Sequence, residues 1–412
     1  MRIVIVEPDS QGGLIHFAYQ LADALATAGA EVTLMTGQHY ELAALPHRFR
    51  VAPLLRLWPP IEAQRSSLLR PLALIRRAYR ALILMREWGR LTAILARDPP
   101  DVVLFSTIRF RFQALFLRAL ARRGVRMGQI CHEFADREAG RSLGARIAKA
   151  VFPDPYRYFQ TVFLFSETAL AVFRGTFPIH GPRAMALPHG PEMIFGGGPE
   201  VRAQLCARYA IAPGAEVVLM FGGLRPSKGV PDLIAAFGGL AGRPDARLLI
   251  VGTPSRDFDL AGARAQIARL ENADRVTLDP RYVPMTELGA LVALASVAVF
   301  PYRSATASGA LALAQSLGRP VVATAVGGLA DAVEDGKTGR LVPPGDSAAL
   351  ARAIGGLLDA PGDAEAMGRA ARAALLRDRG WDLVAARMLA RLRADAAFPT
   401  PAGKGVLSGE PA

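Results

Sequence analysis

The sequence predicts an α/β protein of two doubly wound domains, each built on a parallel sheet, facing each other across a crevice. Short runs of β-branched residues alternate with longer segments of helical character along most of the 412 residues. This alternation is typical of parallel strands joined by crossover helices. The alternation restarts after about Pro191, so the chain holds two series of similar length, which fits a chain long enough for two or three domains.

The first series predicts an N-terminal domain over residues 1–193. Its opening run, RIVIVE, is a buried strand, and the next segment is expected to form a helix from Leu14 to Ala28. Further strands are expected at residues 31–36, 101–106, 126–132, 161–166 and 184–190. The Gly/Pro-rich residues 190–200 are typical of a linker.

The second series predicts a domain over residues 194–380. Its strands are expected at residues 216–223, 246–252, 275–280, 297–302, 320–324 and 340–344. A last helix at 381–396 and a disordered tail at 397–412 follow. Ligands of such folds bind at the carboxyl ends of the strands, so the loops after these strands are the first places to search for a site.

Composition points to a folded protein of the cytoplasm. Hydrophobic residues make up 51% of the chain, which is enough for a large core. Cys131 and Cys206 are far apart in the sequence and have no metal-type spacing, which favours a reducing compartment. The start, MRIVIVEPD, lacks the features of a signal peptide, and we see no apolar run long enough to span a bilayer.

The positive charge is concentrated in the first half of the chain. The net charge is +13; residues 1–195 hold 25 Lys/Arg against 15 Asp/Glu, and residues 196–412 hold 24 against 21. An excess of +10 in one half favours anionic partners such as lipid headgroups or phosphates. The alternative is a compositional preference for arginine, since lysine is almost absent. Nucleic acid is not expected as a partner, because no recognised nucleic-acid motif accompanies the charge.

Residues 56–97 are the most basic segment, with nine arginines and two acids. At 100° per residue, Arg86, Arg90 and Arg97 share one helical face, and Arg76, Arg77 and Arg80 cover another arc. One interpretation is a helix that lies on an anionic membrane, at the cytoplasmic face of the inner membrane. The other is an ordinary core helix with a solvated arginine face.

Two glycine-containing turns are candidate binding loops. Gly12 and Gly13 stand between the first strand and its helix, where backbone amides are able to approach a phosphate or sugar; a plain strand-to-helix turn explains them equally well. In FGGLRPSKGVPDLI, a strand ends at Gly223, and Arg225 and Lys228 follow. A planar guanidinium and an ammonium suit a diphosphate, although a solvated turn remains an alternative.

This last segment resembles the G-R-L-x-x-x-K-G element of glycosyltransferase family 4. The resemblance extends to GGLIHFAYQLADALATAGAEVTLMT, SETALAVF, ALPHG, RYVPMTELGALVALASVAVFPY and AVGGLADAVEDGKTGRLVPPGD. It implies the two-domain GT-B fold and a retaining transfer of a sugar from a nucleotide-sugar donor. It also implies that Arg225 and Lys228 neutralise the donor diphosphate, and that the segment containing Val283 holds the nucleobase.

The donor loop of this family departs from its usual form here. Many members carry two glutamates in an E-x7-E motif, and the aligned positions are Ala305 and Leu313. No Asp or Glu occurs from Leu288 to Ala330. We expect the loop to bind its anion through backbone amides near Thr306, Ser308 and Gly309, because Ser308 is a good helix N-cap and the helix start favours negative charge.

Histidines are the remaining acid–base candidates. His132 follows a strand in the first domain, and the resemblance implies that it faces the donor sugar; a satisfied strand-end histidine is the alternative. His189 is expected to be structural, and His16 to line an acceptor site. No His/Asp/Glu group has metal-ligand spacing, so we expect neither a metal nor another cofactor.

The function expected from the sequence is glycosyl transfer to a saccharide or lipid-linked saccharide in polysaccharide or glycolipid biosynthesis. The leaving phosphate is able to take the acceptor proton, so the protein has mainly to position the sugar and stabilise charge on the diphosphate. Two alternatives stay open: a GT-B epimerase of a nucleotide sugar, and a catalytically silent GT-B subunit that binds a partner or scaffold.

Overall fold

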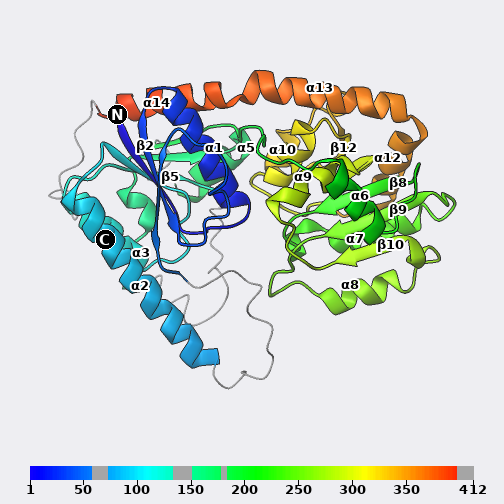
Figure 1. The fold of residues 1–412 in the computed structure, drawn as a ribbon, viewed down its shortest axis with the longest axis horizontal. Coiled ribbons are helices and arrows are strands. Elements are labelled where there is room, and N and C mark those ends of the chain that lie inside the picture. Colours follow the sequence, from blue (N-terminus) through cyan, green and yellow to red (C-terminus); the bar gives the residue numbers. More distant parts are fainter. Residues whose placement is uncertain (58–72, 133–150, 178–182, 397–412) are drawn as a thin grey trace. The chain divides into compact units, whose positions relative to one another are not determined.

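The computed structural model describes residues 1–57, 73–132, 151–177 and 183–396, and these residues form two compact units (Figure 1). The first unit comprises residues 1–165, 170–187 and the C-terminal helix that starts at Trp381; the second comprises residues 166–169 and 188–380. The predicted tail, residues 397–412, and the 58–72 part of the arginine-rich segment lie outside the described residues.

The first unit contains a seven-stranded parallel sheet in the order β3-β2-β1-β4-β5-β6-β7. The strands are β1 (Arg2–Glu7), β2 (Glu31–Gly37), β3 (Arg50–Leu55), β4 (Val102–Phe105), β5 (Met127–Ile130), β6 (Thr161–Leu164) and β7 (Ala184–Ala186). The helices are α1 (Gly13–Thr27), α2 (Ala73–Arg97), α3 (Gln113–Arg122), α5 (Glu167–Thr176) and α14 (Trp381–Ala396). Central strands such as β4 are buried along their whole length, as expected where helices cover both faces.

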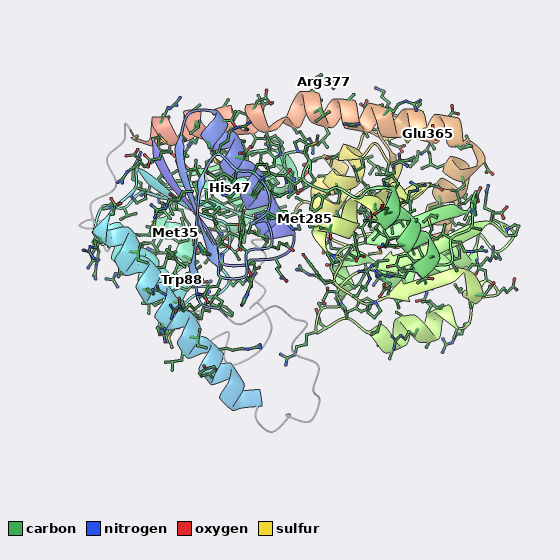
Figure 2. All side chains as sticks on the ribbon, viewed as in Figure 1. Met35, His47, Trp88, Met285, Glu365 and Arg377 are labelled. Carbon is green, nitrogen blue, oxygen red and sulfur yellow. The ribbon has the colours of Figure 1, made fainter. Side chains whose placement is uncertain are left out.

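Helix α2 packs on this unit through a buried face that includes a tryptophan and several leucines. Trp88, labelled in Figure 2, stacks on Phe105 of β4 with the ring centroids 5.6 Å apart. The neighbouring Glu87 is also buried and accepts a hydrogen bond from the backbone N–H of Arg56 at 3.1 Å. These contacts fix one face of α2 against the unit and leave the opposite face exposed.

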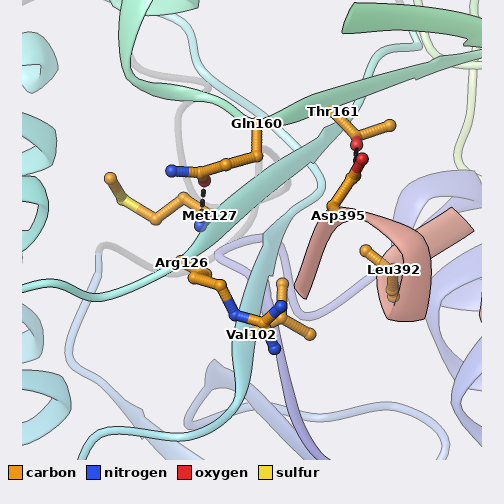
Figure 3. Close-up of a pocket in the computed structure, with 7 residues that line it drawn as sticks. All are labelled: Val102, Arg126, Met127, Gln160, Thr161, Leu392 and Asp395. Carbon is orange, nitrogen blue, oxygen red and sulfur yellow. Dashed lines mark hydrogen bonds between the residues drawn. The ribbon is translucent and has the colours of Figure 1, made fainter. Parts of the chain in front are cut away.

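A small pocket lies beside α14, at the amino ends of the strands (Figure 3). It is lined by Val102, Arg126, Met127, Gln160, Thr161, Leu392 and Asp395. The Thr161 hydroxyl donates to the Asp395 carboxylate, and the Met127 N–H donates to the Gln160 side-chain oxygen at 2.7 Å. The bond between Thr161 and Asp395 anchors α14 to its sheet. Because ligands of parallel sheets bind at the carboxyl edge, we assign this pocket a structural role.

The second unit contains a six-stranded parallel sheet in the order β10-β9-β8-β11-β12-β13. The strands are β8 (Glu216–Phe221), β9 (Ala246–Val251), β10 (Val276–Asp279), β11 (Val297–Phe300), β12 (Val321–Thr324) and β13 (Arg340–Val342). The helices are α6 (Pro199–Arg208), α7 (Val230–Gly238), α8 (Leu260–Ile267), α9 (Met285–Ala293), α10 (Gly309–Ser316), α11 (Gly327–Ala330), α12 (Ser347–Asp359) and α13 (Pro361–Arg379).

The predicted fold class of two parallel-sheet α/β domains is confirmed, and each predicted strand is present. The sequence analysis missed β3, which lies at the edge of the first sheet and contains Pro53. A proline lowers the strand signal, yet an edge strand tolerates it because one side of that strand makes no ladder bonds. Among the described helices, none combines the length and the apolar composition needed to cross a bilayer.

Candidate functional site

Two loops of the second unit meet where the order of its strands reverses. Strands β8 and β11 are neighbours in the sheet, but their next neighbours along the chain, β9 and β12, lie on opposite sides. Such a switch point is where open parallel sheets bind ligands. The loop after β8 carries Gly223, Arg225 and Lys228, and the loop after β11 carries Thr306 and Ser308. The topology therefore brings most predicted site residues of this unit together.

Backbone contacts hold these two loops against each other. Gly229 has φ +67°, and a Cβ at that position would collide with the carbonyl oxygen of Pro301. The N–H of Arg303 donates to the carbonyl oxygen of Ser227 at 2.8 Å. The Arg303 guanidinium also donates two bonds to the Asp232 carboxylate, at 2.9 and 2.8 Å. The loop that carries Arg225 and Lys228 is thus fixed before any ligand binds.

A buried tyrosine connects Lys228 to the start of α10. The Lys228 ammonium nitrogen lies 3.6 Å from the centroid of the Tyr302 ring, which is a close cation–π contact. The Tyr302 hydroxyl lies 3.1 Å from the Ser308 hydroxyl. The sequence analysis missed Tyr302, because only the tertiary fold places Lys228 over its ring.

The predicted N-cap of α10 is confirmed. Ser308 has extended backbone angles, and its side chain accepts a hydrogen bond from the N–H of Leu311 at 3.2 Å. Gly309 opens the helix and leaves room at its start: a Cβ there would lie 3.5 Å from His189 Nε2 and 3.7 Å from Glu192 Oε1. A buried carboxylate therefore lies beside this helix start, although the loop and helix themselves contain none.

His189 is a buried histidine whose lowered pKa keeps it neutral at pH 7. Its Nδ1 lies 2.8 Å from the carbonyl oxygen of Gly190, and the side chain is buried. Burial lowers the pKa of His189 to about 4, because a low-dielectric environment disfavours the charged imidazolium. At neutral pH this histidine adds no positive charge near Gly309.

Two glycines pack closely against the backbone of the loop after β11. A Cβ on Gly327 would collide with the carbonyl oxygen of Ala305, and a Cβ on Gly328 with that of Thr306. The Ser166 hydroxyl donates to the Thr306 carbonyl oxygen at 3.3 Å. In the loop after β8, Gly223 is exposed, and a Cβ there would lie 4.0 Å from Arg225 Nε.

Val283 lies in a loop between β10 and α9 that a polar network fixes. Arg281 donates to Asp279 and to Glu287, each at 2.8 Å, and to the Tyr209 hydroxyl at 2.9 Å. Val283 itself is buried. These bonds restrict the conformation of the loop around Val283.

The remaining predicted residues belong to the first unit. The N–H of Gly12 donates to Glu41 Oε1 at 2.6 Å, and His16 Nε2 lies 2.6 Å from the same oxygen. Glu41 thus occupies the start of α1, where an anion was expected, and His16 pairs with it. Gly13 begins the helix with open space where a side chain would be. His132 lies edge-on to Phe17, with ring centroids 5.0 Å apart.

A second polar cluster lies at the strand-order reversal of the first sheet. Glu7 ends β1, and its carboxylate accepts a hydrogen bond from the N–H of Asp9 at 2.7 Å. Asp9 in turn forms an ion pair with Arg109, in the loop after β4. Burial and the nearby Asp9 charge raise the pKa of Glu7 to about 7. Within the described ranges, no group of three or more His, Cys, Asp or Glu side chains is arranged to hold a metal ion.

The comparisons with known proteins agree with this geometry. Residues 215–360, most of the second unit, match the model of the family described as glycosyl transferases group 1. The chain is 38% identical over 212 residues to a D-inositol 3-phosphate glycosyltransferase of Streptomyces griseus, an alignment covering 49% of this chain and 44% of that protein. The family match lies entirely within the second unit.

A second relative is a GDP-mannose-dependent alpha-(1-6)-phosphatidylinositol monomannoside mannosyltransferase of Mycolicibacterium smegmatis. It is 36% identical over 220 residues, which cover 50% of this chain and 56% of that protein. The chain therefore spans about half the length of the curated relatives it matches.

The solved structures show the fold over nearly the whole chain. Sucrose-phosphate synthase from Thermosynechococcus elongatus superposes with a TM-score of 0.68 at 23% identity, covering 96% of this chain and 99% of that one. At this identity the likeness establishes the architecture and not the activity. Both domains accordingly have the GT-B fold predicted from the sequence.

Proposed function

We propose that this protein is a retaining glycosyltransferase of the family 4 type, in a variant without the two glutamates of the E-x7-E motif. It would move a sugar from a nucleotide-sugar donor to a saccharide or lipid-linked saccharide in polysaccharide or glycolipid biosynthesis. The relatives that act on inositol phosphate or on a mannosylated lipid, by their names, support this class of reaction.

The observation that carries the proposal is the cationic loop at the switch point of the second unit. Arg225 and Lys228 lie in a loop locked onto its neighbour by Arg303 and Asp232. Two cations on a fixed loop beside an N-capped helix suit a diphosphate, since charge-assisted bonds and a helix start both favour an anion. A nucleotide-sugar donor carries that diphosphate, and the loop around Val283 would hold its base.

The chemistry needs little acid–base work from the protein. In a retaining transfer, the acceptor oxygen bonds to the anomeric carbon as the bond to the diphosphate oxygen breaks. The acceptor hydroxyl proton passes to that phosphate oxygen on the same face. The catalytic contribution of Arg225 and Lys228 is to stabilise the negative charge that grows on the leaving diphosphate, while His132 would face the donor sugar.

A panel of nucleotide sugars tests this proposal. The purified protein should release a nucleoside diphosphate from at least one donor, and release should persist in excess EDTA because the two cations take the role of a metal. Loss of activity in EDTA that Mg²⁺ or Mn²⁺ restores would contradict the metal-free part. Accumulation of an epimerised nucleotide sugar would favour the epimerase instead.

Helix α2 has an exposed face that suits contact with a membrane, where a lipid-linked acceptor would be found. Its exposed side carries Tyr79 and Leu82, which are 63% and 62% exposed, together with Met85. Arg86 and Arg97 are exposed farther along the helix. Apolar side chains that insert at the headgroup level, next to arginines that attract anionic lipids, are typical of a helix lying on a membrane. We propose peripheral contact of residues 65–97 with the cytoplasmic face of an anionic membrane.

Flotation with liposomes tests this contact. Reversing Arg76, Arg77 and Arg80 to Glu should reduce flotation with anionic liposomes, since each arginine contributes roughly 1 kcal/mol at such a surface. Leu82→Ser should weaken it further, and added salt should weaken wild-type binding. The matched control reverses Arg264, Arg269 and Arg352, which are exposed in the second unit. Equal binding to neutral liposomes, or equal losses in the control, would overturn the membrane contact.

A further inference from the structure

Tyr302 lies between two parts of the candidate donor site. Its ring is only 1% exposed, and the Lys228 ammonium covers it at 3.6 Å from the ring centroid. Its hydroxyl lies 3.1 Å from Ser308 Oγ, the atom that caps α10. One buried side chain thus contacts both the cation and the helix start that are expected to bind the diphosphate.

The tyrosine is itself held rigidly. The ring meets Phe300 edge-on, with centroids 5.9 Å apart and an interplanar angle of 86°. The Thr324 hydroxyl of the neighbouring strand β12 donates to the carbonyl oxygen of Tyr302 at 2.5 Å. A ring fixed by packing on one side and by its hydroxyl on the other gives Lys228 a defined position.

We propose that Tyr302 is a positioning residue, which holds the Lys228 ammonium at a set distance from the start of α10 so that both engage one diphosphate. This inference rests on the proposed function and deepens it. A flexible lysine side chain loses rotamer freedom when it binds an anion, and a lysine already fixed on a ring has less to lose.

The diphosphate does not need to displace Lys228 from the ring. The negative face of the ring attracts the whole ammonium group, which keeps N–H donors on its other side. Because the ring is buried and Lys228 is half-buried above it, that other side faces outward. The tyrosine therefore favours diphosphate binding and does not compete with it, so replacing Tyr302 is expected to weaken that binding.

The ligand-free arrangement is measurable by NMR. The sequence contains four lysines, at positions 149, 228, 337 and 404, so reductive ¹³C-methylation gives a simple spectrum. Nuclei above an aromatic face shift upfield, so one lysine methyl signal should be shifted upfield and should disappear in Lys228→Arg. The shift should persist in Tyr302→Phe and vanish in Tyr302→Leu. Absence of any shifted lysine signal in the wild type would overturn the inference without relying on a variant that folds.

Calorimetry with UDP, GDP and inorganic pyrophosphate tests the positioning role. Tyr302→Leu should weaken binding of the preferred nucleotide and of pyrophosphate about 2- to 30-fold, while Tyr302→Phe should lose less. In a Lys228→Ala background, Tyr302→Leu should change affinity less than about twofold, because the two residues act through one contact. A merely structural tyrosine would give additive losses.

The outcomes separate the two claims. Wild-type protein that binds none of the three probes would contradict the proposed function. Normal wild-type binding with unchanged or tighter binding in Tyr302→Leu would contradict the positioning role and leave the function intact. Additive losses in the double variant would also contradict it.

Discussion

Arg225→Ala and Lys228→Ala are each expected to weaken nucleoside diphosphate binding about 10- to 100-fold. A hydrogen bond to a charged group contributes about 1.5–3 kcal/mol, which corresponds to that change in the dissociation constant. Both substitutions should also slow transfer, because charge on the leaving diphosphate is larger in the transition state than in the bound donor. Residues 288–330 contain no Asp or Glu, so no carboxylate of this segment is able to bind the donor together with the two cations.

Calorimetric titration with a panel of nucleoside diphosphates measures this loss. Lys337→Ala and Arg269→Ala are matched controls, since both side chains are exposed in the same unit and lie away from the two loops in sequence. The controls should bind as tightly as the wild type. Unchanged affinity in folded Arg225→Ala and Lys228→Ala proteins would show that other residues bind the donor diphosphate.

Glu7→Gln is expected to remove one large contribution to the pH dependence of stability, the part that makes stability fall as pH rises. Glu7 is 0% exposed, and burial followed by the Asp9 charge raises its pKa from 4.5 to about 7. The folded protein therefore binds more protons than the unfolded chain between these pH values. The contribution of Glu7 to the free energy of unfolding should therefore fall as pH rises through this window, by about 3 kcal/mol in total.

Urea unfolding at pH 5 and pH 8 checks this expectation. Between the two pH values, Glu7→Gln should lose less stability, or gain more, than the wild type, because a glutamine does not ionise. The lowered pKa of His189 makes stability rise with pH, but it is the same in both proteins, so their difference reports Glu7. Glu365→Gln is the matched control, because Glu365 lies on the exposed surface of α13 (Figure 2). The same pH slope in Glu7→Gln as in the wild type would show that another group carries the effect.

Much of the fold was predictable because its signals are local. Runs such as VVLF and VAVF are buried on both faces, and such strands read directly as continuous apolar segments. The N-cap at Ser308 followed from residue type and position. Strand β3 was missed because Pro53 and its edge position give it a weak pattern.

The parts of the site that escaped prediction depend on tertiary contacts. Tyr302 looks like an ordinary core aromatic until the fold places Lys228 over its ring. Glu192 precedes α10 by a long stretch of chain, so a search for acids within residues 288–330 does not find it, yet it lies beside Gly309. The Gly12 amide was expected to meet a ligand, and only the structure shows that Glu41 binds it.

The most direct test of the central claim is the anomeric configuration of a transferred sugar. Wild-type protein with its preferred donor and a saccharide or lipid-linked acceptor should form a product that keeps the configuration of the donor, as NMR of that product would show. Arg225→Ala and Lys228→Ala should form it much more slowly, and Lys337→Ala at the wild-type rate. A wild-type protein that binds donors but neither transfers nor hydrolyses any of them would contradict the account and identify a silent GT-B subunit.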